Sequence, residues 1–470
     1  SRIWHGSGIS SAESWTQTSQ NHCPIHSSMS GEIQTYQTSH CRHDSSFVAH
    51  DNGIGQLFRD FGEKYIAVFK PDYVQIKLIR SIRVCKTPAL GGKRYTCQGC
   101  HHQSYVYFGC GNSRCPKCQG VKRMQWQDKI AAKILQCPYQ HIVFTMPHRL
   151  NGLAKRNQTQ LYNCLMRSAW SSLAQCAADP DNLGARPGAI MVLHTFGSDL
   201  KYHVHVHALV TFGGLAHDGQ WKWPKRKKKI VPFRQFRRVF RQHFLKKLSK
   251  QYHELNTTEP WDRLQRDLLA KSWCVHTEPP TANTKVLQEY LGRYICRIGL
   301  SKKRFHYDSV NRFVTLTFKD YRNKKEHSAI PIATKQLPPL VAMSHILAHC
   351  LPPYFQKCRY YGMHATANKD RIDAQLPTHI KNNNHTIRTV FQILTAMLGI
   401  DVMTCHICHS TLFTEDAIAK DQSWKLSWLN IPTNRGSPSI PAHAMINQAP
   451  AGSGRADLSP IPANTALSTP

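Results

Sequence analysis

The stretch from Tyr202 to Val210 alternates histidine with valine and then passes into an apolar run. Alternation with period two and β-branched residues is typical of a β-strand, in which successive side chains point to opposite faces. His203, His205 and His207 should therefore share one face, while the valines between them point into a core. The pattern predicts a strand held by its apolar side that presents a row of imidazoles on the other.

A row of imidazoles favours metal binding. Imidazole is the commonest metal-ligating side chain, and neighbouring same-face positions of a strand lie roughly 6.5–7 Å apart at Cα. Two such rings can converge on one ion, whereas the first and third, roughly 13 Å apart, would be strained as joint ligands. We therefore expect a divalent ion held by two histidines of this strand and by one or more side chains from elsewhere. The alternative is a hydrogen-bonded polar face of a sheet.

The net charge of the chain indicates what kind of molecule it binds. The chain carries 61 Lys and Arg against 28 Asp and Glu, a formal charge of +33 over 470 residues. Such an excess favours a polyanion, most simply DNA, over a generic gain in solubility. Apolar runs stay well short of the about 18 residues that a transmembrane helix needs, and no secretory signal pattern stands at the start. We expect a cytoplasmic, nucleoid-associated protein of two to four domains, with no membrane partner.

Two Cys-x-x-Cys pairs, Cys97 with Cys100 and Cys115 with Cys118, enclose 14 residues of mainly β-type sequence. This layout is typical of a zinc ribbon, in which each pair supplies two thiolates to one tetrahedral Zn²⁺. Paired cysteines of this kind indicate metal binding in a reducing compartment rather than a disulfide framework. Four protein ligands leave no open coordination position, so the predicted zinc is structural.

Further cysteines stand near these pairs or far from them. Cys85, Cys110 and His101 are left over beside the predicted ribbon and could build a second zinc site or replace ligands of the first. A third pair, Cys405 and Cys408, has no evident second half, although His409 could be a third ligand there.

The segments around the histidine strand predict a small α+β domain with a mostly antiparallel sheet. A basic run and a basic amphipathic helix follow, and in this charge context we expect both to contact the DNA backbone. The predicted elements are a strand at 142–146 stopped by Pro147, a helix at 150–176, a strand at 189–196, the histidine strand ending at Gly213-Gly214, the basic run at 225–229 and the basic helix at 233–248.

Residues 283–298 predict a helix that carries Tyr290 and Tyr294 on one face, because they are four residues apart. Aromatic core packing is one interpretation. A histidine strand about 80 residues earlier and a large positive charge open another, because a phenol can attack a phosphodiester and leave a phosphotyrosine link. An imidazole-held divalent ion would polarise the phosphate and position it for in-line attack.

Taken together, these segments resemble the insertion-sequence 91 (IS91) family of two-tyrosine transposases, within the HUH nuclease group. The resemblance spans roughly residues 57–410 in family order. It is carried by Cys85-Lys86-Thr87, Leu90-Gly91-Gly92, Tyr95-x-Cys97-x-x-Cys100, Cys115-Pro116-Lys117-Cys118-Gln119, Phe144-Thr145-Met146-Pro147-His148, Leu193-His194-Thr195-Phe196, the histidine strand with Gly213-Gly214-Leu215, Tyr290-Leu291-Gly292-Arg293-Tyr294 and Arg359-Tyr360-Tyr361-Gly362.

The resemblance implies rolling-circle transposition. One tyrosine would cleave a single DNA strand, giving a 5′-phosphotyrosine and a free 3′-OH, and the second would permit strand exchange. It assigns the nucleophiles to Tyr290 and Tyr294 in either order. It assigns the metal ligands to His205 and His207 and makes His203 an auxiliary residue that could also bind.

Several details stay open in this comparison. The third ligand of the catalytic ion could be Gln288, Glu289 or His194, and the sequence does not select Mg²⁺ or Mn²⁺. The family usually has histidine where this chain has Lys93 and Arg114, which argues against a second zinc site.

The implied fold is α+β, with an N-terminal zinc ribbon, an HUH-type nuclease domain whose mostly antiparallel sheet is flanked by helices, and a helical C-terminal region. The rival hypothesis is a non-catalytic zinc-ribbon DNA-binding protein or a decayed element product. The predicted divisions are a disordered arm or upstream non-native sequence (1–50), the zinc-binding domain (51–138), the nuclease domain (139–330), a C-terminal accessory region (331–423) and a disordered tail (424–470).

Overall fold

The computed structural model describes the sheet that carries the histidines. Some of the predicted site residues lie outside the residues that it describes. Tyr290, Tyr294, Gln288 and Glu289 lie outside the described residues, as do the predicted arm and tail. The described residues are 53–283, 300, 304–321, 323, 328–365, 367, 369–381, 387–399 and 401–420.

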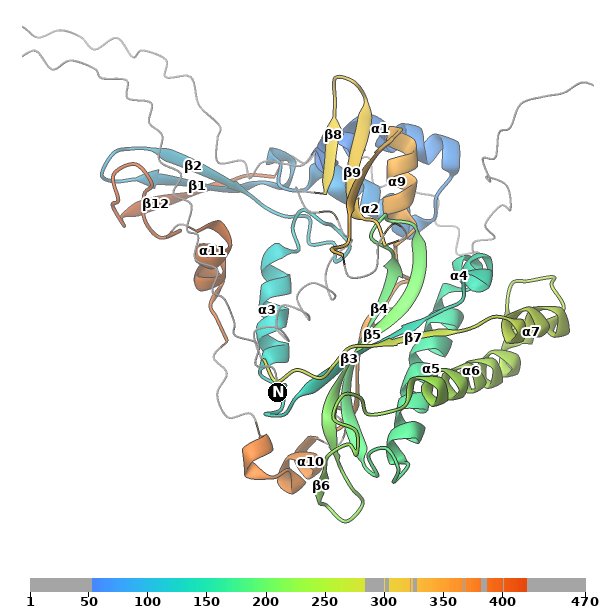
Figure 1. Ribbon diagram of the computed structural model, residues 1–470. Helices are drawn as coiled ribbons and strands as arrows, with labels where there is room; N and C mark the ends of the chain where they lie inside the picture. The colour runs from blue at the N-terminus through green and yellow to red at the C-terminus, as the bar shows by residue number, and fades with distance from the viewer. Residues whose placement is uncertain are drawn as a thin grey trace, which may run out of the picture. The chain divides into compact units, whose positions relative to one another are not determined.

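The elements alternate between helices and short strands along the chain (Figure 1). The helices are α1 (Ile54–Phe69), α2 (Tyr73–Val84), α3 (Gly120–Ala131), α4 (Asn151–Arg156), α5 (Gln158–Ala178), α6 (Phe233–Lys250), α7 (Trp261–Ala270), α9 (Pro339–Leu347), α10 (Lys369–Gln375) and α11 (Val390–Leu398). The strands are β1 (Gly92–Cys97), β2 (Gln103–Tyr107), β3 (Tyr139–Thr145), β4 (Arg186–Phe196), β5 (Tyr202–Leu215), β6 (Trp221–Lys222), β7 (Cys274–Thr277), β8 (Phe305–Asp308), β9 (Phe313–Lys319), β10 (Ile332–Leu337), β11 (Cys358–Gly362) and β12 (Phe413–Ile418).

Within the described part of the chain the strands form three sheets, and all their pairings are antiparallel. The central sheet has the order β11-β4-β5-β3-β7, with β6 beside β5. The two small sheets are β12-β1-β2 and β10-β9-β8. The expected α+β class with an antiparallel sheet and flanking helices is confirmed.

One face of the central sheet packs in the main core, and the other carries the histidines together with a smaller apolar cluster that includes Ile190, Val192 and Leu209. Val204 and Val206 are fully buried in the largest core cluster, together with apolar side chains of α5 and α6 that cover this face (Figure 1). Because side chains alternate along β5, His205 and His207 point to the opposite face. The predicted strand, with its valines in the core, is therefore confirmed.

β5 ends at Leu215, one residue after the Gly213-Gly214 pair at which we expected it to end. Gly213 and Gly214 do not stop the strand, because Gly214 pairs with Pro187 of β4 on one side and with Lys222 of β6 on the other. A Cβ on Gly213 would run into the ring of Trp221, so glycine is needed here for close packing rather than for a turn.

The C-terminal region predicted to be helical also supplies strands to sheets that begin much earlier in the chain. β11 pairs with β4 at the edge of the central sheet, and β12 pairs with β1 in full register from Gly92↔Ile418 to Cys97↔Phe413. α9 packs in a separate core cluster with α1, α2, β8 and β9. The elements β11, β12 and α9 of this region thus pack against parts of the fold that begin much earlier in the chain.

Replacing Gly362 with alanine should destabilise the edge of the central sheet. Gly362 ends β11 at a φ of +60°, and a Cβ there would overlap the carbonyl oxygen of Pro187. The left-handed backbone alone costs a residue with a Cβ roughly 1–3 kcal/mol, so we expect the free energy of unfolding in urea to fall by at least about 2 kcal/mol. Gly152→Ala is the control: its Cβ meets only a distant Arg156 side chain, and alanine in a helix should be neutral or stabilising. Equal effects of both changes would contradict the assignment.

His364 should make stability depend on pH. Its Nε2 lies 3.1 Å from the hydroxyl of Tyr139, which accepts the backbone N–H of Leu135 and so donates to a neutral imidazole. Burial, with a smaller contribution from Lys133, lowers the pKa of His364 to about 4. Below pH 6.5 the unfolded imidazole takes up a proton that the folded one does not, so stability falls as the pH falls, by about 2 kcal/mol at pH 5.

The measurement is urea unfolding of the wild type and of His364→Gln at pH 7 and pH 5. The variant should lose clearly less stability over this interval than the wild type does, because glutamine does not titrate. The same loss in both proteins would show that His364 titrates normally when folded.

Candidate active site

Three histidines of the central sheet come together on the face opposite the main core. His194 of β4 is the direct cross-strand neighbour of His205 of β5, and His207 follows two residues later on the same face. A nitrogen of each ring lies within 4.8 Å of a nitrogen of the others. The Nε2 atoms of His205 and His207 are 3.0 Å apart. We call His194, His205 and His207 the histidine triad.

The hydrogen bonds around His205 and His207 indicate which nitrogen of each of these two rings carries the proton. Nδ1 of His205 lies 2.9 Å from the carbonyl oxygen of His203, which can only accept, so this Nδ1 donates. Nδ1 of His207 lies 2.9 Å from Nε2 of His141, whose own Nδ1 is 3.4 Å from a carboxylate oxygen of Glu278. His141 therefore donates to Glu278 and accepts from His207.

It follows that His205 and His207 each present an Nε2 lone pair at the point where the rings meet. Burial is the largest cause that holds the pKa of His194 and of His207 well below 6.5, and it lowers the pKa of His205 to about 3. The three imidazoles are therefore neutral at pH 7, which is the form that binds a metal. Two lone pairs 3.0 Å apart repel each other unless a cation lies beside them.

The triad fits a divalent ion. A separation of 3.0 Å between two nitrogens is close to that of adjacent ligands around an octahedral ion with bonds of about 2.1 Å. His141 and Glu278 would act behind His207, since a ligating histidine almost always donates its second N–H to a carboxylate, a carbonyl or another acceptor. The donor set of three imidazoles also resembles the ligands that proteins use for transition metals.

The structure brings together the predicted pair, His205 and His207, and adds His194, one of the three candidates for the third ligand. The other two candidates lie outside the described residues. His203 does not join the group; its ring lies 5.1 Å from the ring of His148 and 5.0 Å from that of His205. Sequence reasoning did not find His141 or Glu278, because they lie on β3 and just after β7, far from the histidine strand in sequence.

The predicted ribbon of Cys97, Cys100, Cys115 and Cys118 is not formed as one site. The 14 residues between the pairs contain β2, which runs back along β1 in a hairpin. A strand of five residues is about 17 Å long, so the hairpin carries the second pair to the opposite end from the first. The cysteines instead form two groups of four: Cys85, Cys110, Cys115 and Cys118, and Cys97, Cys100, Cys405 and Cys408.

The first group of four, which we call the inner tetrad, includes both cysteines that were left over in the sequence. Sγ of Cys110 lies 3.7 Å from Sγ of Cys118, and the N–H of Cys110 points to Sγ of Cys85 at 3.4 Å. Two zinc-bound thiolates with Zn–S bonds of about 2.3 Å are about 3.8 Å apart in a tetrahedron, so the tetrad fits Zn²⁺. Cys85 and Cys115 are buried in the core cluster that contains α1, α2 and α9.

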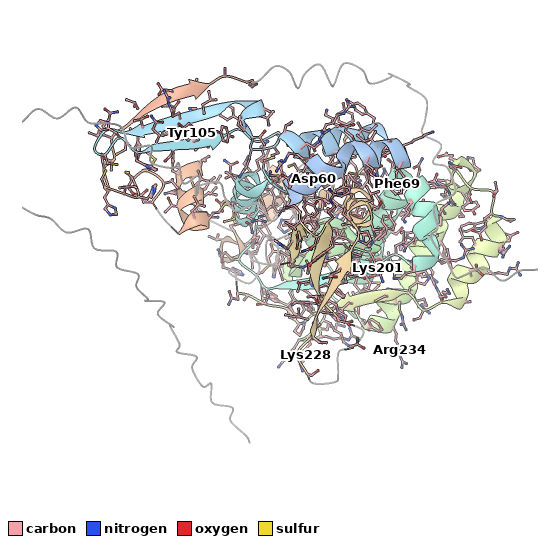
Figure 2. The ribbon with its side chains drawn as sticks, turned by 90° about the horizontal axis from the view of Figure 1, so that it is seen from above. Asp60, Phe69, Tyr105, Lys201, Lys228 and Arg234 are labelled. Carbon is pink, nitrogen blue, oxygen red and sulfur yellow. The ribbon has the colours of Figure 1, made fainter. Side chains whose placement is uncertain are left out.

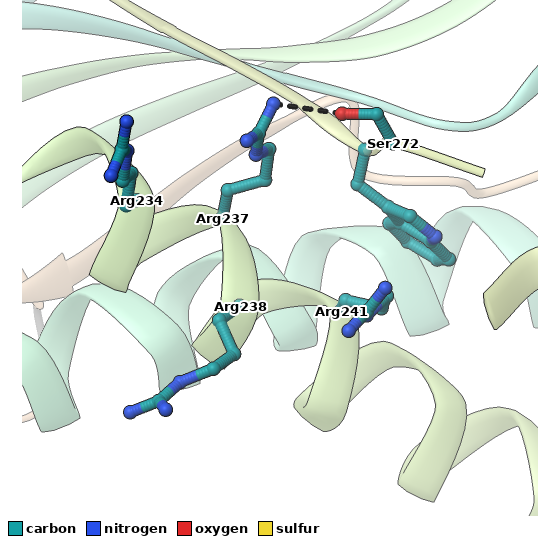
Figure 3. A pocket seen from close by; sticks show the side chains of 6 residues that line it. Arg234, Arg237, Arg238, Arg241 and Ser272 are labelled. Atoms are coloured by element: carbon teal, nitrogen blue, oxygen red, sulfur yellow. Dashed lines mark hydrogen bonds between the residues drawn. The ribbon is translucent and has the colours of Figure 1, made fainter. Parts of the chain in front are cut away.

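Four arginines gather on the outer side of α6 and form a pocket with the residues that lead into β7 (Figure 3). Arg237 donates to the hydroxyl of Ser272 at 2.8 Å, and Arg241 donates to the carbonyl oxygen of Leu269 at 3.2 Å. The apolar side of the same helix is buried in the main core, as predicted. The pocket is lined by Arg234, Arg237, Arg238, Arg241, Ser272 and Trp273.

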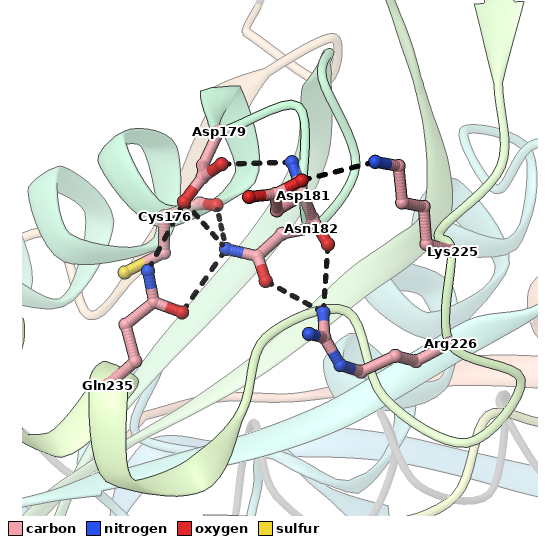
Figure 4. A network of polar contacts seen from close by, with 7 residues as sticks. All are labelled: Cys176, Asp179, Asp181, Asn182, Lys225, Arg226 and Gln235. Atoms are coloured by element: carbon pink, nitrogen blue, oxygen red, sulfur yellow. Dashed lines mark hydrogen bonds and ion pairs between the residues drawn. The ribbon is translucent and has the colours of Figure 1, made fainter.

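The basic run 225–229 divides into an anchored part and an exposed part. Lys225 forms an ion pair with Asp181, and Arg226 donates to the backbone oxygen of Asp181 and to Asn182, which fixes this segment to the end of α5 (Figure 4). The side chain of Lys228 is exposed and projects outward, as does that of Arg234 (Figure 2). Arg226 is thus held against the protein, whereas the side chains of residues 227–229 are exposed.

Two domain families match this chain, one over the segment with the inner tetrad and one over the segment with the histidine triad. Residues 57–146 match the family described as "Transposase zinc-binding domain", and residues 188–371 match that described as "Putative transposase". The first match contains the inner tetrad and the second contains the histidine triad. Fold, site and matches together define a transposase with a zinc-binding module.

Two similar proteins show to which family of transposases the chain belongs. The chain is 32% identical over 335 residues to "Putative transposase y4qJ" of Sinorhizobium fredii, which covers 68% of this chain and 82% of the relative. It is 26% identical over 358 residues to the "Transposase for insertion sequence element IS801" of Pseudomonas savastanoi pv. phaseolicola, covering 74% and 84%. The chain belongs to the IS91 family of transposases.

Among solved structures, the chain is similar to the conjugative relaxase TrwC in a metal-bound complex with oriT DNA. The identity is 12%, the TM-score is 0.22, and the likeness covers 50% of this chain and 93% of the relaxase chain. A TM-score this low carries no conclusion about the present site. Among the described residues, no helix is long and apolar enough to cross a membrane.

Proposed function

We propose that this transposase cleaves and rejoins single-stranded DNA through a 5′-phosphotyrosine intermediate, with a divalent ion bound by His194, His205 and His207. The observation that carries the proposal is the pair of Nε2 lone pairs that His205 and His207 direct to one point, 3.0 Å apart. The nucleophiles are Tyr290 and Tyr294, assigned by the family motif because they lie outside the described residues. Because the proposed substrate is DNA, we expect the protein to be associated with the bacterial nucleoid.

The cleavage step transfers a phosphoryl group from DNA to protein. The Oη of one tyrosine attacks the scissile phosphorus, a P–Oη bond forms and the P–O3′ bond breaks. The phenolic proton passes to solvent, and the departing 3′-oxygen takes up a proton to become a free 3′-OH. Rejoining is the reverse reaction with the 3′-OH of another strand end, and the second tyrosine lets two strands be held at once.

The ion, when bound, would polarise the scissile phosphate and offset the negative charge of the transition state. The histidines hold that position without a net charge of their own. His141 and Glu278 keep His207 in the tautomer that leaves Nε2 available. Three imidazoles are softer ligands than Mg²⁺ prefers, so among the two expected ions the donor set favours Mn²⁺.

DNA binding would draw on the positive side chains that the fold leaves exposed. The arginines of α6 and the exposed lysines 227–229 are available for phosphate contacts, which give affinity but no sequence preference. Arg237 and Arg241 are positioned by their hydrogen bonds to Ser272 and Leu269. Removing these charges should lower affinity for all DNA sequences alike and flatten its dependence on salt.

The test is covalent capture. The full chain is incubated with Mn²⁺ and a single-stranded oligonucleotide of the element's end, and products are separated in SDS. A label at the 3′ end should move with the protein, while a label at the 5′ end should appear on a shorter free strand, because the link is to the 5′-phosphate. Tyr290→Phe with Tyr294→Phe should abolish the adduct, whereas Tyr361→Phe, a tyrosine stacked on Trp170, should not.

Each outcome separates the hypotheses. An adduct that persists in the double variant would refute the assignment of the nucleophiles. A wild-type protein that binds end sequences but forms no adduct on any of them would favour the rival, a non-catalytic zinc-containing DNA-binding protein.

A further inference from the structure

The second group of four cysteines joins two knuckles that are alike in backbone geometry but more than 300 residues apart. In the first, the N–H of His101 donates to the carbonyl of Cys97 at 2.9 Å; in the second, the N–H of His409 donates to that of Cys405 at 2.9 Å. His101 and His409 have positive φ angles of 57° and 59°. Two segments with the same turn after the same Cys-x-x-Cys-His pattern form the two halves of a pseudo-symmetric site.

The sulfur positions fit a tetrahedral ion. Sγ of Cys97 lies 3.5 Å from that of Cys408, and Sγ of Cys100 lies 3.7 Å from that of Cys405. Both values are near the about 3.8 Å expected between zinc-bound thiolates and far from the about 2 Å of a disulfide.

The sheet that carries this site has no apolar core to hold it together. Among the described residues, β1, β2 and β12 contribute no side chain to the three hydrophobic clusters. β12 is attached by backbone pairing and by exposed ion pairs, such as Arg94 with Asp416 at 2.9 Å. Exposed ion pairs contribute about 0–1 kcal/mol each, which is too little to keep a six-residue strand in place.

We propose that Cys97, Cys100, Cys405 and Cys408 bind a second structural Zn²⁺, which fastens residues 401–420 to the β1–β2 hairpin. We call these four cysteines the outer tetrad. Cys405 and Cys408 lie beyond both family matches, which end at residues 146 and 371. The inference does not depend on the proposed DNA cleavage, because four thiolates leave no position for a substrate.

The first measurement is the zinc content of the full chain purified under reducing conditions. Cys405→Ser with Cys408→Ser should bind one zinc fewer per chain than the wild type, and Cys97→Ser with Cys100→Ser should lose the same ion. Cys274→Ser is the matched control, because Cys274 is an exposed cysteine outside both tetrads. A Cys405/Cys408 variant with undiminished zinc content would overturn the proposal.

Cobalt(II) substitution separates this site from the histidine triad, because the intense sulfur-to-cobalt absorption reports thiolate ligands only. The wild type should show about twice the sulfur-to-cobalt absorption of the Cys405/Cys408 variant. An equal absorption in both proteins would place the cobalt in the inner tetrad alone and refute the outer site.

Hydrogen exchange tests the structural role. In the Cys405/Cys408 variant the amides of β12 and those of β1 that pair with it should lose protection, while the central sheet keeps its own. Should the double variant fail to fold, Cys408→His retains a zinc ligand and should restore both the second zinc and the protection of β12. Full protection of β12 without the second zinc would contradict the fastening role.

Discussion

Replacing His207 with alanine should lower the rate of metal-dependent DNA cleavage by about 10³-fold. A divalent ion that stabilises transition-state charge contributes several kcal/mol, and about 4 kcal/mol corresponds to a factor of about 10³ in rate. His207 supplies one of the two converging Nε2 atoms, so its loss removes a ligand from the triad. The rate is measured as single-turnover cleavage of an end oligonucleotide over a series of Mn²⁺ concentrations.

Two further variants make this result specific. His141→Ala should raise the Mn²⁺ concentration needed for half-maximal cleavage by about 10–100-fold, because His141 orients His207 without touching the ion. His203→Ala should change the rate by less than about tenfold, since only the backbone oxygen of His203 serves His205. A larger loss in His203→Ala than in His207→Ala would mean that the ion is held by a different pair of the strand.

The second large effect concerns the inner tetrad. Cys115→Ser should abolish cooperative thermal unfolding of the zinc-binding part and leave it largely unfolded at 37 °C. Structural zinc contributes on the order of 10–16 kcal/mol of apparent binding free energy in small zinc domains, which is comparable to the whole stability of a typical domain. Cys115 is fully buried in the core cluster of α1, α2 and α9, so a failed site also disrupts that core.

The matched control is Cys350→Ser. Cys350 is buried in the same cluster but belongs to neither tetrad, so its replacement should cost only the about 1–3 kcal/mol of burying a hydroxyl. Near-UV circular dichroism during heating, with zinc content measured in parallel, distinguishes the two variants. Similar losses in both would mean that the inner tetrad stabilises the core by packing and not by metal.

The β-structure around the histidines was largely predictable because its signals are local. Alternation predicted β5 and the burial of its valines. Regular pairing from Phe196↔Tyr202 would put His194 opposite Val204, and only the register shift between His194 and Phe196 brings it opposite His205, so the third ligand could not have been chosen from the turn alone. The predicted helix 150–176 instead breaks at Asn157, whose side chain donates to the carbonyl of Leu153 and accepts the N–H of Asn256. A contact with a residue 99 positions away has no local signature.

The grouping of the cysteines failed for the same reason. Spacing favoured joining the two nearest pairs, yet the hairpin between them places them at opposite ends. The repeated pattern Cys-x-x-Cys-His at Cys97 and at Cys405 was the available sign that these two knuckles belong together. The outcome depends on which strand ends meet, and that is decided by the pairing of β1 with β12, an interaction between residues more than 300 positions apart.

Because β1 pairs with β12, this sheet can be completed only late in the synthesis of the chain. Lys93 and its partner Glu415 are 322 residues apart, so a ribosome adding about 5–20 residues per second needs roughly 16–64 s to supply the second after the first. Throughout that interval β1 has an open edge, of the kind that invites pairing with foreign strands, and its knuckle offers only two thiolates. The β1–β2 hairpin therefore emerges without its third strand, and a transcript cut short before the codon for Cys405 would yield a chain that lacks both β12 and the second knuckle.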